Sequence, residues 1–127
     1  WSWSKRNDRS TLRKTTHMAT GRFIVKTDVR GEFRFNLEAS NGQVILSSEG
    51  YTTKANCLNG IASVRKHAEE DRSYERNISR TGGYHFNLKA ANGQIIGTSQ
   101  HYETSVGMEN GIHSVMIHAP EAATLEG

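Results

Sequence analysis

The sequence predicts an α+β fold: two β-β-β-α repeats related by a pseudo-twofold axis, forming a six-stranded antiparallel sheet with both helices on one face. Three observations predict it. Residues 33–68 and 84–119 align without a gap at a constant offset of 51, and half of their positions are identical. Within each copy, apolar residues first alternate with polar ones, as in strands, and then recur every three or four positions, as in a helix. Each copy also contains an Asn-Gly pair between two strand-like runs, which is typical of a hairpin.

The repeat sets the expected domain organisation. Residues 21–69 form the first repeat and residues 72–120 the second, and together they make a single domain over residues 21–120. Residues 1–20 are interpreted as a basic N-terminal tail, either disordered or derived from upstream cloning sequence, and residues 121–127 as a C-terminal tail. A unit of about 50 residues buries little apolar surface. The two repeats are therefore expected to share one core, as a monomer with an intramolecular pseudo-dimer.

Each repeat contains three predicted strands. The first runs from Phe23 to Thr27 and reaches the second through a turn ending at Gly31. Its counterpart at residues 74–79 has fewer apolar positions, so it is expected at a sheet edge. The Asn-Gly pairs, whose residues tolerate the positive φ of a type I′ turn, then connect the second strands to the third. The second strands span residues 33–39 and 84–90, and the third strands span residues 43–49 and 94–100.

A helix closes each repeat. Thr52 or Thr53 is expected to cap the first helix, and Thr104 or Ser105 the second. A glycine falls in the middle of both helices, where it costs about 1 kcal/mol relative to Ala. Because the apolar stripe stays in phase across these glycines, close packing is favoured over a helix break. The stripes are Cys57, Ile61, Val64 and Ala68 in the first helix and Met108, Ile112, Val115 and Ala119 in the second.

The run FNLxAxNGQxI, followed by Tyr, a capped helix and NGIxSV, resembles the YegP-like family of small uncharacterised bacterial proteins. The resemblance covers roughly residues 21–120 and both copies. It implies a fold built from paired β-β-β-α units, which two chains would supply in single-copy members. The resemblance brings no catalytic residues, because none are established for the family. The weaker strand at 74–79 and His113, where the first copy has Ala62, depart mildly from the pattern.

Charge is unevenly distributed along the chain. The net charge is +3, yet residues 1–20 alone hold five Lys and Arg side chains against Asp8, so the rest is slightly acidic. The folded part therefore lacks the basic footprint expected of a nucleic-acid reader. No segment has the roughly 20 consecutive apolar residues of a membrane span. Cys57 is the single cysteine, which excludes an intramolecular disulfide and suits a cytoplasmic location.

Catalytic and cofactor motifs are absent from the sequence. It contains no P-loop, GxGxxG or HExxH pattern. His67 and His118 occupy equivalent helix C-termini, where a cation interacts well with the helix dipole. Cys57 is replaced by Met108 in the second copy, which favours a buried apolar role over a nucleophilic one. No enzyme activity, cofactor or metal site is predicted.

The remaining candidate is a surface, the sheet face opposite the helices. Polar side chains alternate outward along the second and third strands, and Asn recurs centrally in both copies although strands disfavour it. We expect a small non-enzymatic interaction or accessory module that uses this face or the sheet edge, with a protein or peptide as partner. The alternative functional hypothesis is a weak nucleic-acid-binding module anchored by the basic tail, and the face is alternatively an ordinary solvated one. The candidate surface residues are Arg34, Asn36, Glu49, Tyr51, His85, Asn87, Gln100 and Tyr102, with the two tyrosines at its rim.

Overall fold

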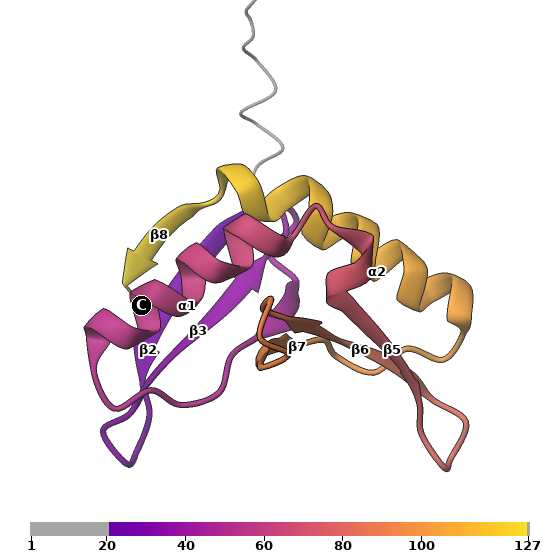
Figure 1. Cartoon of the computed structure of the whole chain (residues 1–127), viewed down its shortest axis with the longest axis horizontal. Helices are drawn as coiled ribbons and strands as arrows, with labels where there is room; N and C mark the ends of the chain where they lie inside the picture. Colours follow the sequence, from indigo (N-terminus) through magenta and orange to yellow (C-terminus); the bar gives the residue numbers. More distant parts are fainter. Residues whose placement is uncertain (1–20, 127) are drawn as a thin grey trace, which may run out of the picture.

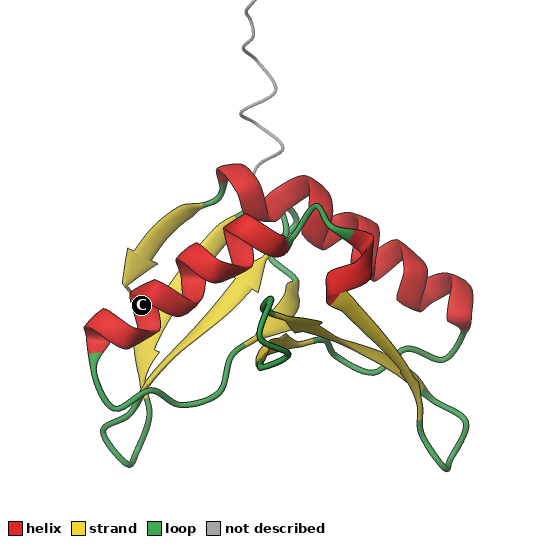
Figure 2. Cartoon of the chain, in the orientation of Figure 1, coloured by secondary structure: helices red, strands yellow, loops and turns green. Residues whose placement is uncertain are grey.

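The structure, a computed structural model, describes residues 21–126 and has the α+β architecture that the sequence predicts. Figure 1 shows the two helices over one side of a twisted sheet, running outward in opposite directions, and Figure 2 shows the strands below them, except for the C-terminal strand, which lies at the outer edge beside the first helix. The N-terminal residues 1–20, interpreted above as a basic tail, lie outside the described residues. The elements are β2 (Arg22–Thr27), β3 (Phe33–Glu38), β4 (Val44–Ser47), α1 (Lys54–His67), η2 (Asp71–Ser73), β5 (Tyr74–Ile78), β6 (Tyr84–Lys89), β7 (Ile95–Thr98), α2 (Ser105–His118), η3 (Ala119–Glu121) and β8 (Ala123–Glu126).

The sheet runs in the order β5-β6-β7-β4-β3-β2-β8. The strands of each repeat therefore follow one another outward from a central β4–β7 pair, and β5 lies at an edge as predicted. Ser47 pairs with Thr98 across the antiparallel β4–β7 contact. These two residues are equivalent in the 51-residue offset. An antiparallel pair of equivalent residues is the arrangement that a local twofold axis produces.

A seventh strand, β8, changes the predicted sheet. It pairs in parallel with β2, Ile24 facing Leu125, so the sheet is mixed rather than six-stranded and antiparallel. The prediction that residues 121–127 form a C-terminal tail was wrong for Ala123–Glu126. The outer edge of β2 offers unpaired backbone groups that a further strand can satisfy, and Arg65 on α1 binds the arriving chain. Its guanidinium donates to the Ala122 carbonyl at 2.5 Å and to Thr124 Oγ1 at 3.0 Å.

The hairpins after the second strands have three-residue loops rather than the predicted two-residue type I′ turns. Ala39 donates its N–H to the carbonyl of Gln43, and the N–H of Gly42 donates to the carbonyl of Ala39. Gly42 has φ +86°, and Gly93 takes the same value in the second repeat. A left-handed residue at the end of the loop is typical of a turn followed by a bulge. A separate irregularity shifts the strand register between Leu37 and Glu38, where Ile45 is an extra residue in β4.

Both helices begin at a threonine cap. Thr53 Oγ1 accepts from the N–H of Asn56 at 3.1 Å, and Thr104 Oγ1 accepts from the N–H of Gly107 at 2.9 Å. The caps satisfy backbone donors that the first helical turn leaves free. Within residues 21–126, no helix combines the length and apolar character needed to cross a membrane.

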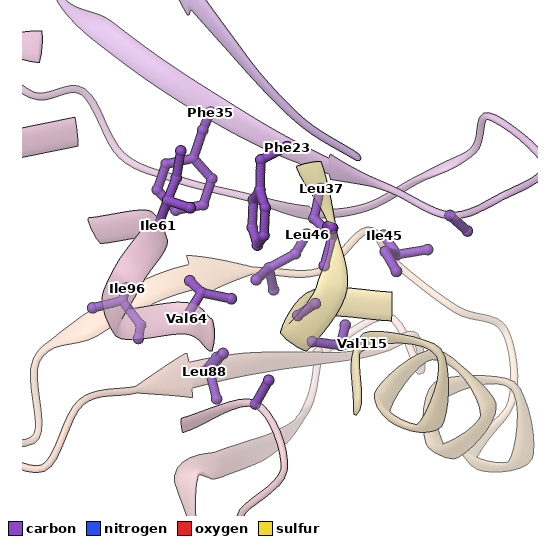
Figure 3. Close-up of a cluster of buried hydrophobic side chains, with 14 of the residues drawn as sticks. Phe23, Phe35, Leu37, Ile45, Leu46, Ile61, Val64, Leu88, Ile96 and Val115 are labelled. Carbon is purple, nitrogen blue, oxygen red and sulfur yellow. The ribbon is translucent and has the colours of Figure 1, made fainter. Parts of the chain in front are cut away.

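One hydrophobic core joins the two repeats. Figure 3 shows Phe35, Leu37 and Val64 of the first repeat in the same cluster as Leu88 and Val115 of the second. Cys57 belongs to this core with no exposed surface, and burial raises the pKa of its thiol. The predicted buried role of Cys57 is therefore confirmed.

The mid-helix glycines let tyrosine rings pack beneath the helices. A Cβ at Gly60 would lie 2.5 Å from Tyr51 Oη and 3.2 Å from a ring carbon of Phe35. Tyr51 in turn stacks on Phe35, with ring centroids 6.4 Å apart and the planes inclined by 13°. Gly111 and Tyr102 repeat this arrangement in the second repeat. The predicted close packing of these glycines is confirmed, and it also places both tyrosines on the helix side of the sheet.

Candidate functional site

The candidate site is the face of the sheet opposite the helices, called the open face below. Because Phe35 and Leu37 point into the core, the residues that alternate with them in β3 point to the open face. A transverse row of cross-strand partners crosses this face through the central pair. From β5 to β8 the transverse row consists of Glu75, Asn87, Thr98, Ser47, Asn36, Ile24 and Leu125.

The second-repeat half of the transverse row is a closed hydrogen-bond network. Glu75 accepts from Asn87 Nδ2 at 3.0 Å and from Lys89 Nζ at 2.9 Å. Thr98 Oγ1 donates to Asn87 Oδ1 at 3.0 Å. Hydrogen bonds from Asn87, Lys89 and Asn77 lower the pKa of Glu75 to about 2, because they favour its ionised form. The polar groups of this half are thus largely satisfied within the protein.

Asn87 departs from its predicted exposure. It is 8% exposed, although its partners place it on the open face rather than beneath a helix. The neighbouring Glu75 and Thr98 cover its amide. Arg34 is exposed and Asn36 and His85 are half-buried, so the alternation predicted the face correctly but not the side-chain packing on it.

The first-repeat half of the transverse row lacks the equivalent hydrogen-bond network among residues 21–126. Ile24 occupies the position equivalent to Glu75, so Asn36 lacks the carboxylate that engages Asn87. Among residues 21–126, neither the Asn36 amide nor the Ser47 hydroxyl forms a side-chain hydrogen bond. Asymmetry between the repeats therefore leaves hydrogen-bonding capacity on one side of the central pair.

A hollow of about 340 Å³ lies over this first-repeat half. Arg34 borders it and forms an ion pair with Asp28, its Nε lying 2.9 Å from Oδ2. The hydrogen bond from Arg34 lowers the pKa of Asp28, and the same bond raises the pKa of Arg34. Lys26 also borders the hollow and has no ion pair among the described residues. The residues that define this hollow, called the β3 hollow below, are Lys26, Asp28, Arg34, Asn36, Ser47 and Ser48.

Histidines mark the outer end of the second-repeat half. The rings of His85 and His101 have centroids 5.3 Å apart and planes inclined by 32°. His85 Nδ1 is buried and has no hydrogen-bond partner among the described residues. Within residues 21–126, His, Cys, Asp and Glu form no group of three or more that would hold a metal ion.

The eight predicted surface residues therefore divide into three groups. Arg34, Asn36, His85 and Asn87 share the open face, whereas Glu49 and Gln100 are exposed beyond the ends of β4 and β7. Tyr51 and Tyr102 are partly exposed, but their rings pack toward the helices rather than on the open face. Their rings fill space that the mid-helix glycines leave free, and burial raises the pKa of Tyr51.

Sequence reasoning missed Lys26 and Glu75, two charged residues of the open face. Both lie on the first strand of a repeat, whereas the predicted surface included only the second and third strands and the residues that follow them. The alternation of buried Phe23 and Val25 with Ile24 and Lys26 carried the necessary signal.

The family comparison matches both repeats. The model of the family described as Domain of unknown function (DUF1508) matches residues 28–75 and 79–126, again with an offset of 51. Each matched unit begins after a first strand and ends in the strand that follows the helix, so β8 ends the second unit as β5 ends the first.

Similar proteins come from several bacteria. A UPF0339 protein encoded in the 5′ region of the ptx operon of Stutzerimonas stutzeri is 50% identical over 107 residues, 84% of this chain and 96% of that protein. The UPF0339 protein YegP of Escherichia coli O6:H1 is 47% identical over 98 residues, 77% of this chain and 89% of that protein. Both alignments are longer than one matched unit, so these relatives also span two.

Solved structures share the fold. The solution NMR structure of YegP from E. coli, a protein of unknown function, superposes with a TM-score of 0.82 at 41% identity, covering 86% of this chain and 94% of that one. A UPF0339 protein from Shewanella oneidensis gives a TM-score of 0.81 at 39% identity. With two matched units and relatives of this similarity, the chain belongs to the DUF1508 family, the YegP-like UPF0339 proteins, whose function is uncharacterised.

Proposed function

We propose that this protein is a non-enzymatic, cytoplasmic interaction module that binds an acidic segment of a partner protein in the β3 hollow. The observation that carries the proposal is the unequal use of the open face. Asn87 is satisfied by Glu75, whereas its equivalent Asn36 faces Ile24 and forms no side-chain hydrogen bond within residues 21–126. An amide with a free donor and acceptor can pair with the backbone of a bound segment.

The charge of the β3 hollow supports an acidic partner. Lys26 and Arg34 contribute two positive charges, and Asp28 neutralises one of them through its ion pair with Arg34. Because Arg34 is oriented by Asp28, its remaining N–H donors are held in place before a ligand arrives. A preorganised guanidinium and an ammonium group that has no ion pair in the described part of the chain favour carboxylates. A protein segment bearing Asp or Glu is the matching ligand.

A nucleic-acid partner has less support. The basic charge on which that hypothesis depends lies in residues 1–20, outside the described residues, and the remainder is slightly acidic. The β3 hollow also carries no aromatic side chain on which a base could stack.

The test is a selection from a random peptide library displayed on phage, followed by NMR mapping of the selected peptides on the full chain. We expect acid-rich peptides whose binding shifts the amide signals of Lys26, Arg34, Asn36 and Ser47. Lys26→Glu should weaken binding by about tenfold or more, since a hydrogen bond to a charged group contributes about 1.5–3 kcal/mol. The matched control, Arg80→Glu, changes the charge equally on an exposed turn of the second repeat and should have less than about a twofold effect.

Two results would count against this function. Selected peptides without acidic residues would remove the charge argument. Binding that shifts signals outside the β3 hollow, or that Lys26→Glu and Arg80→Glu weaken equally, would show that the open face does not select the ligand.

A further inference from the structure

A second and larger hollow, about 590 Å³, lies away from the β3 hollow at the junction of the two repeats. It is formed where the end of α1, the linker containing η2, the end of β6 and the β6–β7 turn meet. Its volume falls in the range of small-molecule sites, about 300–1,000 Å³. The residues that define this junction hollow are Lys66, His67, Glu70, Arg72, Lys89 and Ala91.

Positive charge reaches the junction hollow from three separate elements. Lys66 comes from α1, Arg72 from η2 and Lys89 from β6. Glu70 is the one carboxylate in the lining, and it already accepts a hydrogen bond from Ser73 Oγ at 3.2 Å. Arg72 lies 3.7 Å from Glu70, and its side chain is 85% exposed. Lys89 Nζ lies 2.9 Å from Glu75 Oε2, so its charge is already paired. With Glu70 and Glu75 counted against Lys66, Arg72 and Lys89, the hollow keeps an excess of one positive charge, which favours an anionic ligand.

The excess of positive charge is not a consequence of the fold. In the repeat, Lys66 corresponds to Ile117 and Arg72 corresponds to Ala123. Lys89 corresponds to Glu38 in the first repeat. The corresponding junction on the other side of the molecule thus lacks all three cations. Since the two repeats share their backbone arrangement, these charges are a local property of this hollow.

A buried histidine completes the lining. His67 is 7% exposed, and its Nδ1 lies 2.9 Å from the carbonyl oxygen of Ser63. A carbonyl oxygen can only accept, so Nδ1 carries a proton and donates it. Nε2 is then the ring nitrogen that remains for a ligand, and as an acceptor it can bind a protonated phosphate oxygen.

We propose that the junction hollow binds a small phosphate-bearing molecule. Arg72 supplies paired donors that match phosphate oxygens, and Lys66 supplies a point charge from the end of α1. Ala90 and Ala91 provide an apolar wall against which the organic part of such a molecule can lie. Two cations on separate elements can each contact a different oxygen of a phosphate group. The site is independent of the peptide binding proposed for the β3 hollow.

The test is a titration of the ¹⁵N-labelled full chain with pyrophosphate and, separately, with ADP, at constant ionic strength. We expect saturable shifts at Lys66, His67, Arg72 and Ala91 with both probes. Tighter binding of ADP would identify an organic phosphate as the preferred ligand, and equal binding an inorganic one, with the same site engaged in either case. Residue-specific signals separate this binding from nonspecific attraction to the basic residues 1–20.

The decisive variants are Arg72→Gln and Arg80→Gln, which remove one exposed positive charge each. Arg72→Gln should weaken pyrophosphate binding about tenfold, because a charge-assisted hydrogen bond is lost, whereas Arg80→Gln should change it by less than about twofold. Lys26→Glu, which tests the peptide site, should leave pyrophosphate binding intact. Equal losses in Arg72→Gln and Arg80→Gln, or shifts confined to residues 1–20, would overturn the proposal. Shifts that fail to saturate would show general ionic attraction and would overturn it equally.

Discussion

Leu46 occupies the space that a side chain at Gly97 would fill. A Cβ built on Gly97 would lie 2.7 Å from both Cγ and Cδ2 of Leu46, which is itself fully buried. The two residues are equivalent in the repeat and lie on the paired central strands β4 and β7. Two leucines here would collide, so one repeat carries the large residue and the other carries none. The duplication therefore allows an asymmetric core that two identical chains could not form.

Gly97→Ala is the first prediction. Overpacking against Leu46 should lower the free energy of unfolding by about 1–3 kcal/mol. Leu46→Ala alone should lower it by about 2–5 kcal/mol through the cavity it leaves. In the double variant the alanine at 97 no longer meets Leu46, so its cost should largely disappear. A double-mutant cycle from urea unfolding measures this coupling, and additive losses would mean that the two sites do not compete for space.

Gly60→Ala should also destabilise the protein, although alanine is the better helix former. The added methyl group would meet Tyr51 Oη at 2.5 Å and the ring carbon Cζ at 2.9 Å. We expect a net loss of about 1–2 kcal/mol in the free energy of unfolding, after the propensity gain of about 1 kcal/mol. Asn59→Ala, one position earlier and exposed, is the control and should be neutral or stabilising. A stabilised Gly60→Ala would show that the ring can move aside.

Arg65→Met should release β8 while the rest of the sheet stays folded. Arg65 binds Ala122 and Thr124 and lies over the ring of Phe23, its Cζ 5.0 Å from the ring centroid. Methionine is the residue at the equivalent position 116 and keeps the apolar contact. Amide hydrogen exchange should accelerate in residues 123–126, with a loss of about 1–3 kcal/mol in local stability.

The matched control for β8 is Arg30→Met, which removes an exposed arginine from the β2–β3 turn and should leave exchange in residues 123–126 unchanged. Unaltered exchange in Arg65→Met would show that backbone pairing with β2 holds the strand without the guanidinium.

Glu75→Gln should reduce the loss in the free energy of unfolding that the protein shows as the pH falls. The folded-state pKa of Glu75 lies near 2, below its ordinary value of 4.5. Its ionisation therefore contributes stability that is fully present above pH 4.5 and is lost as pH falls toward 2. Urea unfolding between pH 5 and 2 should show a smaller loss in the variant than in the wild type. Part of the slope should remain, since Asp28 and Glu109 also have lowered pKa values.

Glu69→Gln supplies the comparison for this profile, because it makes the same chemical change on an exposed linker residue. A Glu75→Gln profile that coincides with the wild type and with Glu69→Gln would mean that the network around Asn87 does not depend on the carboxylate charge.

The full chain should be a monomer, and one repeat should not fold alone. Residues 21–69 would leave the core side of Ile61 and Val64 and the inner edge of β4 uncovered. Light scattering on the full chain should give the mass of one chain, and circular dichroism of the 21–69 fragment should show either an unfolded chain or a concentration-dependent dimer. A folded monomeric fragment would contradict the shared core.

The 51-residue repeat and its two periodicities determined most of the fold. They predicted the order of six strands and both helices, the burial of Phe35 and Leu37, and the capping threonines. These features are predictable because alternation and helical spacing are properties of short stretches of chain. The strand β8 was missed although the offset maps Tyr74 and Glu75 onto Leu125 and Glu126. Its all-exposed side chains give no alternation, so its place depends on the free edge of β2.

Only the tertiary structure shows which contacts each residue makes and how the contacts of equivalent residues differ. Tyr51 reads as a surface residue, yet it lies beneath α1 because Gly60 leaves space there. Asn36 and Asn87 are the same residue type at equivalent positions, but only Asn87 contacts a carboxylate. Its neighbour on β5 is Glu75, whereas the neighbour of Asn36 on β2 is Ile24. The sequence by itself determined which residues share a face, because that follows from local periodicity. Which polar groups are satisfied and which remain available to a ligand depends on neighbours distant in the chain, which only the folded arrangement brings into contact.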